Sequence, residues 1–276
     1  MIWCPYTDKE ISPDDASREH IIPLSLGGLD GFEIPVDKEF NSRVGAKLDG
    51  ALANDFLVAL SRNAHDIRGH SKRRPVVTVK KSADADTGSP LQVTFDQAGG
   101  LKMWCPINNK YVEEPGKKLS SQVNISTDID ISFVAKVALS AGYFAYGECF
   151  QGCVRHDELR LMMNNTPRDL EAKNANIDTL VDGRFSSNSA DELKIFRLLC
   201  KAVSPASIVG LVPSPGRLGV FVGILGSYMG MVNVPAVVDD FPNEGVYDLG
   251  HVICPQNGDL VRVSFRRALQ KLVGDV

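Results

Sequence analysis

The sequence predicts an α+β protein in which antiparallel strands and helices are grouped along the chain. Three observations support this class. Residues 3–61 read as strand, loop, strand and helix; residues 76–105 contain three β-type runs separated by turn signals; and residues 207–265 hold further apolar strands that close on a short helix. Hairpin-type connections of this kind favour antiparallel pairing.

Length and composition set limits on the class of protein. The 276 residues suffice for one large domain or two modest ones, and a net charge of -4 gives no global signature of nucleic-acid binding. Any basic surface must therefore be local. The start of the chain lacks the regions of a signal peptide, and the apolar stretch 208–238 is broken by prolines and glycines, so we expect no membrane span. Six scattered cysteines favour a reducing cytoplasm.

The first domain is expected to span residues 1–75. An extended segment over 3–11 precedes a short strand over 19–24, and Gly27-Gly28 permits a tight return of the chain. Residues 41–61 predict one amphipathic helix, whose apolar stripe is Val44, Leu48, Leu52, Phe56 and Leu60. A polar and basic stretch over 68–75 then predicts the domain boundary.

The second domain is expected to span residues 76–276. Runs at 76–80, 91–95 and 101–105 predict a meander, and a helix is expected from near Asp130, with Thr127 and Asp130 resembling a capping box. A second helix is predicted over 189–199, strands over 207–232 and 251–265, and a closing helix over 266–272. Asn257-Gly258 predicts a two-residue hairpin turn.

Glu19, His20 and Asn41 carry the strongest chemical signal. A magnesium ion takes oxygen ligands and keeps several waters, so the Glu19 carboxylate and the Asn41 amide oxygen would suffice to hold it. His20 lies on the opposite face of an extended strand from Glu19, and an imidazole can accept a proton from an attacking water. Such a set suits metal-assisted cleavage of a phosphodiester.

Each residue also has an ordinary structural explanation. A histidine beside an acid is usually a surface pair, and an asparagine before a helix is usually an N-cap. The shared context favours function: Arg18-Glu19-His20-Ile21-Ile22-Pro23-Leu24-Ser25-Leu26-Gly27-Gly28, followed by Asn41-Ser42-Arg43-Val44-Gly45-Ala46-Lys47-Leu48-Asp49.

These two segments resemble the HNH endonuclease superfamily over roughly residues 1–60. The resemblance implies a ββα-metal fold, in which two strands and a helix hold one divalent ion. It implies Glu19 and Asn41 as metal ligands and His20 as the general base, all three being catalytic residues. It says nothing about the rest of the chain, residues 61–276.

The chain departs from this family in two ways. Relatives often hold a structural zinc with two Cys-x-x-Cys pairs, but here Cys4 remains alone, with Thr7, Asp37 and Phe40 at the other positions. One cysteine cannot build a tetrahedral site, so we expect the zinc to be lost and Phe40 and Trp3 to pack in its place. The asparagine that orients the base in many relatives also has no counterpart in residues 32–36, where a backbone carbonyl could hold the imidazole instead.

A basic segment over residues 62–81 follows the predicted helix and contains one acid, Asp66. It predicts salt-dependent contacts with phosphates, and the alternative is a solvated linker. The residues expected to contact nucleic acid are Arg43, Arg62, Arg68, Lys72, Arg73 and Arg74.

The sequence therefore predicts a cytoplasmic DNA endonuclease that uses Mg²⁺ or Mn²⁺, and family analogy suggests a bacterial or phage defence or restriction setting. The second domain would choose the target, sense a modified base or small ligand, or form a homodimer. The alternative is a decayed HNH module that binds nucleic acid, or regulates, without cutting. A third reading is a partner protein whose function resides in residues 76–276.

Overall fold

The structure is a computed structural model that describes residues 1–96, 100–112, 118–123, 125, 127–186 and 193–274. The chain forms two compact units: Met1–Leu52 together with Thr127–Val276, and Ala53–Ser126. The boundary expected near residue 75 therefore falls inside the second unit. The chain leaves the larger unit after Leu52 and re-enters it at Thr127.

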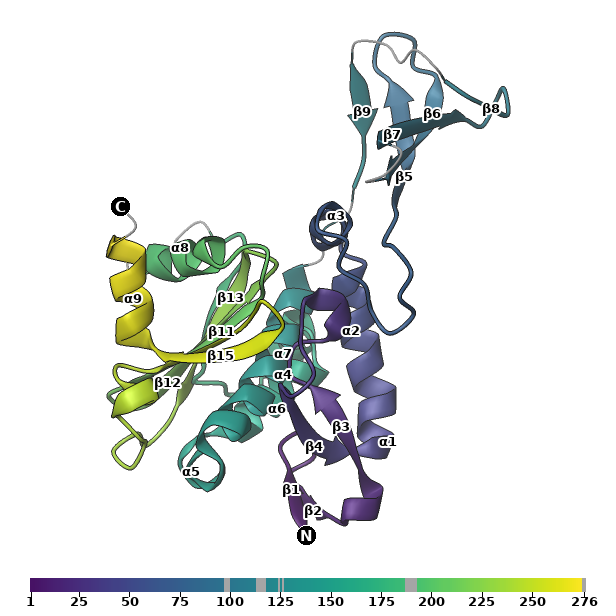
Figure 1. Cartoon of the computed structure of the whole chain (residues 1–276). Helices are drawn as coiled ribbons and strands as arrows, with labels where there is room; N and C mark the ends of the chain where they lie inside the picture. Colours follow the sequence, from purple (N-terminus) through teal and green to yellow (C-terminus); the bar gives the residue numbers. More distant parts are fainter. Residues whose placement is uncertain (97–99, 113–117, 124, 126, 187–192, 275–276) are drawn as a thin grey trace. The chain divides into compact units, whose positions relative to one another are not determined.

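The larger unit combines an N-terminal set of short elements with a long helical and β-sheet portion (Figure 1). The N-terminal elements are β1 (Ile2–Cys4), β2 (Lys9–Ile11), η1 (Pro13–Asp15), β3 (Ala16–His20), η2 (Leu24–Leu26), β4 (Glu33–Asp37), α1 (Lys38–Phe40), η3 (Asn41–Gly45) and α2 (Ala46–Ala53). The later elements are α4 (Thr127–Tyr146), α5 (Glu148–Cys153), α6 (His156–Asn164), α7 (Pro167–Ala172), β10 (Leu180–Gly183), α8 (Lys194–Ala202), β11 (Ile208–Ser214), β12 (Arg217–Ile224), β13 (Ser227–Pro235), η5 (Gly245–Tyr247), β14 (His251–Gln256), β15 (Asp259–Ser264) and α9 (Phe265–Gly274).

A six-stranded antiparallel sheet forms the core of this unit, in the order β10-β13-β12-β11-β14-β15. Helices α8 and α9 cover one face, where their aromatic and aliphatic side chains join Phe221 in a buried cluster, and α4 crosses the other face (Figure 1). β12 is buried along almost all of its length. Its sequence is a nearly continuous apolar run because a strand buried on both faces needs apolar side chains on both. The predicted α+β class with antiparallel strands is confirmed.

Two-residue turns set the register of the hairpins. Asn257 and Gly258 both have positive φ, at 53° and 88°, as a type I′ turn requires, and Gln256 pairs with Asp259 across them. The predicted turn at Asn257-Gly258 is confirmed. Leu225 and Gly226, with φ of 50° and 83°, connect β12 to β13 in the same way.

Helix α4 is the central helix of the larger unit. Its length and its mean hydropathy of 1.2 over 18 residues would suit a membrane span, but 78% of that window is buried inside the fold. Charged residues interrupt its apolar surface, and Asp130 pairs with Arg184 at 3.0 Å. Asp130 therefore serves a tertiary ion pair, whereas the sequence suggested a cap formed with Thr127, which is itself the first residue of the helix.

The helix predicted over residues 41–61 is divided in the structure. A π-helical turn, η3, precedes α2, and α2 ends at Ala53, before a new helix, α3 (Phe56–Ala64). Asp55 accepts hydrogen bonds from the backbone N–H groups of Leu57 and Val58, and it therefore caps α3. The apolar periodicity continues across this break, so the sequence pattern alone did not reveal it.

The smaller unit contains α3 and a five-stranded antiparallel sheet in the order β8-β7-β6-β5-β9. The strands are β5 (Val77–Asp84), β6 (Pro90–Asp96), β7 (Gly100–Cys105), β8 (Lys110–Tyr111) and β9 (Leu119–Ser121). The predicted meander is confirmed as β5-β6-β7. The helix expected over 189–199 appears as α8 from Lys194, and its expected start at residues 189–192 lies outside the described residues. The closing helix predicted over 266–272 is confirmed as α9.

A buried histidine in the large sheet makes the stability of the larger unit pH-dependent. Burial lowers the pKa of His251 to about 4, although the carbonyl of Val246 accepts from its Nδ1. Its Nε2 accepts a hydrogen bond from Arg262 at 2.9 Å. Protonation of Nε2 would break that hydrogen bond and place a positive charge beside the arginine. The folded state thus resists protonation between the unfolded pKa of about 6.5 and about pH 4.

We expect this group to remove about 3 kcal/mol of unfolding free energy as the pH falls through that window. The stability is fully present above pH 6.5 and is lost below it. Urea titrations between pH 7.5 and 4 measure the effect, and His251→Asn should flatten this part of the profile. An unaltered slope in His251→Asn would contradict the assignment.

Candidate functional site

The hairpin of β3 and β4 positions the predicted site residues. The two strands pair antiparallel from Ala16 opposite Asp37 to His20 opposite Glu33. Side chains alternate between the faces of a strand, so Ser17 and Glu19 share one face and His20 lies on the other. The helical segment from Lys38 follows directly. The order is strand, loop, strand and helix, but the strands differ from those that the sequence predicted. The strand expected over 19–24 ends at His20, where the chain turns into η2, and β4 was not predicted.

Glu19 forms an ion pair with Lys136 of α4. The Lys136 ammonium also contacts both carboxylate oxygens of Asp49 in α2, at 2.7 and 2.8 Å. Lys136 is 1% exposed, so this cation is held between two carboxylates from separate elements. Three segments far apart in sequence thus meet at one buried charge cluster.

The charges of this cluster shift one another's pKa values. Burial raises the pKa of Asp49 to about 6, against the opposing effect of Lys136. Burial alone would lower the pKa of Lys136, but the carboxylates of Asp49 and Glu19 raise it. The pKa of the neighbouring Tyr6 is raised by burial and by the negative charge of Glu19. Lys136 is therefore a charged residue at neutral pH, and Tyr6 keeps its proton.

His20 is held by two carboxylates. Its Nε2 lies 3.0 Å from Asp30 Oδ1 and 3.0 Å from Glu33 Oε1, and Glu33 also pairs with Arg18 at 3.3 Å. Glu33 is the direct cross-strand partner of His20, so strand pairing fixes this contact. The sequence pointed to a backbone carbonyl as the group that orients the imidazole, whereas here carboxylates contact it. The three donor atoms lie within 4.8 Å of one another, a set that Mn²⁺ or Zn²⁺ also accepts.

Asn41 lies within the helical segment rather than before it. Asp37 is the N-cap and accepts from the backbone N–H of Phe40 at 2.7 Å, so Asn41 does not have the capping role that an asparagine often has. Its side-chain Nδ2 donates to Ser17 Oγ at 3.2 Å. Because Ser17 and Glu19 share a face of β3, Asn41 lies over the Glu19 face of the hairpin.

Ser207 anchors the loop between β3 and β4, and two glycines shape it. The hydroxyl of Ser207, in the larger unit, donates to the carbonyl of Leu26 at 2.6 Å. Gly27 has a φ of +80°, and a Cβ on Gly28 would overlap the carbonyl oxygen of Ile22. The Gly27-Gly28 pair is thus needed for backbone geometry, which confirms the tight return that the sequence predicted.

Cys4, Phe40 and Trp3, the residues that the sequence associated with a lost zinc site, make other contacts. Cys4 is buried, and its sulfur accepts a hydrogen bond from the backbone N–H of Asp37 at 3.3 Å. Phe40 packs near Tyr6, with ring centroids 5.8 Å apart, while Trp3 packs against Tyr143 of α4.

The six predicted nucleic-acid contacts have different surroundings. Arg43 in the larger unit is exposed, as are Lys72 and Arg73 in the smaller unit. Arg62 donates to the carbonyl of Ala53 at 2.8 Å, and burial lowers its pKa.

Arg68 and Arg74 of the smaller unit both pair with Asp66. Their hydrogen bonds lower the pKa of the Asp66 carboxyl. The one acid of the basic segment therefore offsets part of the charge that these two arginines would offer to a phosphate.

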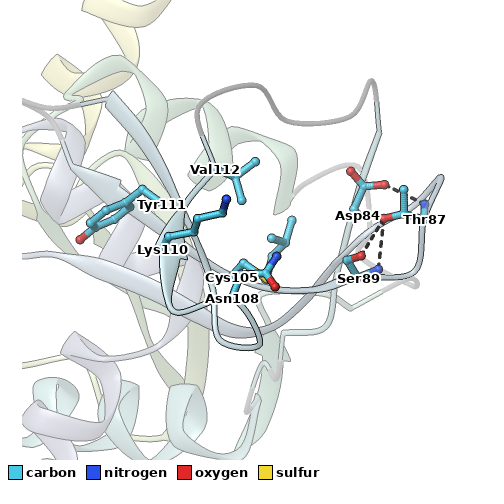
Figure 2. Close-up of a pocket in the computed structure, with 9 residues that line it drawn as sticks. Asp84, Thr87, Ser89, Cys105, Asn108, Lys110, Tyr111 and Val112 are labelled. Carbon is cyan, nitrogen blue, oxygen red and sulfur yellow. Dashed lines mark hydrogen bonds between the residues drawn. The ribbon is translucent and has the colours of Figure 1, made fainter.

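A cavity of about 560 Å³ lies in the smaller unit, beside β6 and β7 (Figure 2). Asp84, Thr87 and Ser89 line one end and are already joined by hydrogen bonds, including Thr87 Oγ1 to Ser89 Oγ at 3.0 Å. Lys110 and Tyr111 lie toward the other end. The described lining of this cavity includes none of the residues that the sequence singled out.

Lys136, Asp49, Asp30 and Glu33 were not identified from the sequence as site residues. One signal was available for Lys136: a lysine stands alone within the apolar stretch 131–139, and such a charge is rarely buried without a partner. The identity of the partner could not be read from the chain, because Glu19 and Lys136 are far apart in sequence.

Comparison with known proteins identified no relative of this chain. No family model, no curated protein and no solved structure matches the chain.

Proposed function

We propose that this protein is a metal-dependent endonuclease that hydrolyses phosphodiester bonds in DNA. The observation that carries the proposal is that one β-hairpin and the helical segment after it hold an acidic oxygen donor, an amide and an imidazole that carboxylates contact. Asn41, in η3, contacts Ser17 on the face of β3 that also carries Glu19, and His20 ends the strand on its other face. Supporting this, the hairpin runs directly into a helical segment, the order of elements in the HNH superfamily that residues 18–49 resemble.

The donor chemistry of the site fits a hard divalent ion. Glu19 supplies a carboxylate and Asn41 an amide oxygen, and Mg²⁺ needs few protein ligands because it retains water. Lys136 is already paired with Glu19, so an ion bound there shares that carboxylate with an ammonium group. When bound, the ion would polarise the phosphate and stabilise the leaving oxygen.

The residues of the chain supply the proton transfer. Glu33 and Asp30 accept from Nε2–H of His20, which fixes the tautomer and makes Nδ1 the nitrogen that takes the proton of the attacking water. Glu33 and Asp30 act as positioning residues, and their negative charge stabilises the imidazolium that forms. Arg18 in turn holds Glu33.

A plasmid-cleavage assay tests the proposal. Full-length protein should nick or linearise supercoiled DNA with Mg²⁺ or Mn²⁺ and not with EDTA. Glu19→Gln keeps the size of the side chain but removes its charge, and should lower the cleavage rate about 10²-fold or more, by comparison with the 10- to 100-fold cost of losing an outer-shell partner. Glu10→Gln, at an exposed position of β2, is the matched control and should cleave normally.

A DNA-binding protein that does not cleave is the second candidate. It is favoured by the Lys136 ammonium, which neutralises the very carboxylate expected to hold the metal. Under this alternative the protein binds DNA with strong salt dependence, and no divalent ion produces cleavage of supercoiled or linear DNA. That result would overturn the endonuclease proposal.

A further inference from the structure

The β5-β6-β7 sheet of the smaller unit has two chemically different faces. One face carries the buried apolar side chains, including Leu91, Val93 and Met103, and Phe95 on this side packs against Phe56 of α3. The alternate positions form the other face, which we call the polar sheet face: Thr78, Lys80, Gln92, Thr94, Lys102 and Trp104. Each of these residues is exposed or half-buried.

The register of the strands groups hydrogen-bonding side chains on the polar sheet face. Thr78 of β5 lies opposite Thr94 of β6, and their hydroxyls are 3.1 Å apart; Thr94 lies opposite Lys102 of β7. Gln92 lies opposite Trp104 on its other side. A row of amide, hydroxyl and ammonium groups thus crosses three strands.

A β-bulge adds positive charge beside Gln92. Val79 pairs with Val93 and Ser82 with Leu91, so Lys80 and Lys81 together oppose the single residue between. Both lysines are exposed. Lys102, the third lysine of the region, reaches Asp96 at 3.1 Å, which offsets its charge, so the bulge lysines carry most of the positive charge here.

The two units differ in charge. Residues 53–126 contain eleven lysines and arginines against seven acids, a net charge of +4, whereas the rest of the chain carries -8. The whole-chain value of -4 conceals this separation. The smaller unit therefore has the sign that attracts a polyanion, and the larger unit the sign that repels one.

We propose that the polar sheet face binds duplex DNA and reads base edges in the major groove. Neighbouring strands lie about 4.8 Å apart, and the major groove, about 12 Å wide, admits two such strands. The pair β5 and β6 carries Thr78, Lys80, Gln92 and Thr94 of this face. Glutamine can bond an adenine edge through both of its amide atoms, threonine contacts thymine methyl groups, and lysines contact phosphates. The Trp104 ring packs edge-on against Tyr111, with ring centroids 5.0 Å apart. Most side chains of the polar sheet face are therefore hydrogen-bonding groups and not aromatic rings on which bases could stack, which favours a duplex over a single strand.

This inference shares one assumption with the proposed function, namely that the ligand is DNA. The face belongs to the smaller unit, whereas Glu19, His20 and Asn41 belong to the larger one. Binding and cleavage can therefore be tested separately.

The test uses full-length protein and fluorescence anisotropy with a random-sequence duplex of about 30 base pairs, without divalent ions and over a range of salt concentrations. Lys80→Ala/Lys81→Ala should weaken binding about tenfold or more at about 0.1 M salt and lower the salt slope by about 2, because each lysine would neutralise one phosphate. Lys201→Ala/Lys271→Ala removes the same charge from exposed positions of α8 and α9 and should leave affinity and slope unchanged.

Gln92→Ala tests readout of bases. Selection from a randomised duplex library should give a defined preference for the native protein, and Gln92→Ala should lose that preference at one or two positions while its affinity for random duplex stays within about twofold. Equal weakening in the two double variants, an unchanged selected sequence, or tighter binding of single-stranded DNA would each overturn the inference. If Lys80→Ala/Lys81→Ala binds DNA normally while the native protein cleaves it, this inference fails and the proposed function stands. If that variant no longer binds DNA and the native protein does not cleave it, this inference stands and the proposed function fails.

Discussion

Replacing His20 with alanine is expected to lower the rate of DNA cleavage by about 10²- to 10⁴-fold, the usual contribution of a general base. The variant loses the nitrogen that accepts the proton from water, while the oxygen donors of Glu19 and Asn41 remain. The His20 side chain is only 16% exposed and contacts Asp30 and Glu33, so its removal should also cost some stability, and rates are compared at a temperature at which the variant is folded. Single-turnover cleavage of labelled duplex at saturating Mg²⁺ gives the rate, and circular dichroism verifies the fold.

The carboxylates that hold His20 provide the control for this prediction. Glu33→Gln should reduce the rate about 10- to 100-fold, as removal of an orienting partner usually does, and Glu33→Asp, which keeps the carboxylate, should recover part of that loss. DNA affinity should not change. If His20→Ala cleaves at the native rate, His20 has no part in the chemistry. Equally slow cleavage by Glu33→Gln and Glu33→Asp would indicate a structural role for Glu33 instead.

Replacing Lys136 with methionine is expected to reduce the unfolding free energy by about 3–5 kcal/mol, the usual cost of breaking a buried pair by removing one partner. Methionine fills a similar volume but leaves the carboxylates of Glu19 and Asp49 without their cation. Because Lys136 opposes the rise in the pKa of Asp49, its removal should raise that pKa further. Urea denaturation at pH 8 and pH 5 measures the effect.

The sign of the pH dependence distinguishes charge from packing. Asp49 has a raised pKa in the folded state, so the folded state takes up its proton more readily than the unfolded state and gains stability as the pH falls. Lys136→Met should therefore be less destabilised at pH 5 than at pH 8. Lys136→Met/Glu19→Gln/Asp49→Asn removes all three charges and should recover much of the stability. Equal destabilisation at both pH values, with no recovery in the triple variant, would mean that packing alone explains the result.

The same variant tests the metal site. If Lys136 and a divalent ion share Glu19, then Lys136→Met should bind Mn²⁺ more tightly, and its melting temperature should rise more on addition of Mn²⁺ than that of the native protein. Lys136→Met/Glu19→Gln should lose that gain. This readout does not depend on cleavage.

Local sequence signals predicted the local structure well. The alternation and turn residues of 76–105 and 251–265 specified hairpins, and Asn257-Gly258 specified a turn that needs two positive φ angles. The helix over 41–61 was less well predicted, because the apolar spacing continues through Asn54 and Asp55, and a capping side chain interrupts a helix without altering that spacing.

The sequence by itself determined the strands of 76–105, 207–232 and 251–265, the Asn257-Gly258 turn and the adjacency of Glu19 and His20, because these depend on the conformational preferences of neighbouring residues. Only the tertiary structure decided what those two side chains contact. Lys136 reaches Glu19 from a helix more than a hundred residues later, and strand pairing brings Glu33 to His20. Long-range partners of this kind follow from chain packing and strand register, which carry no signature in a single stretch of sequence.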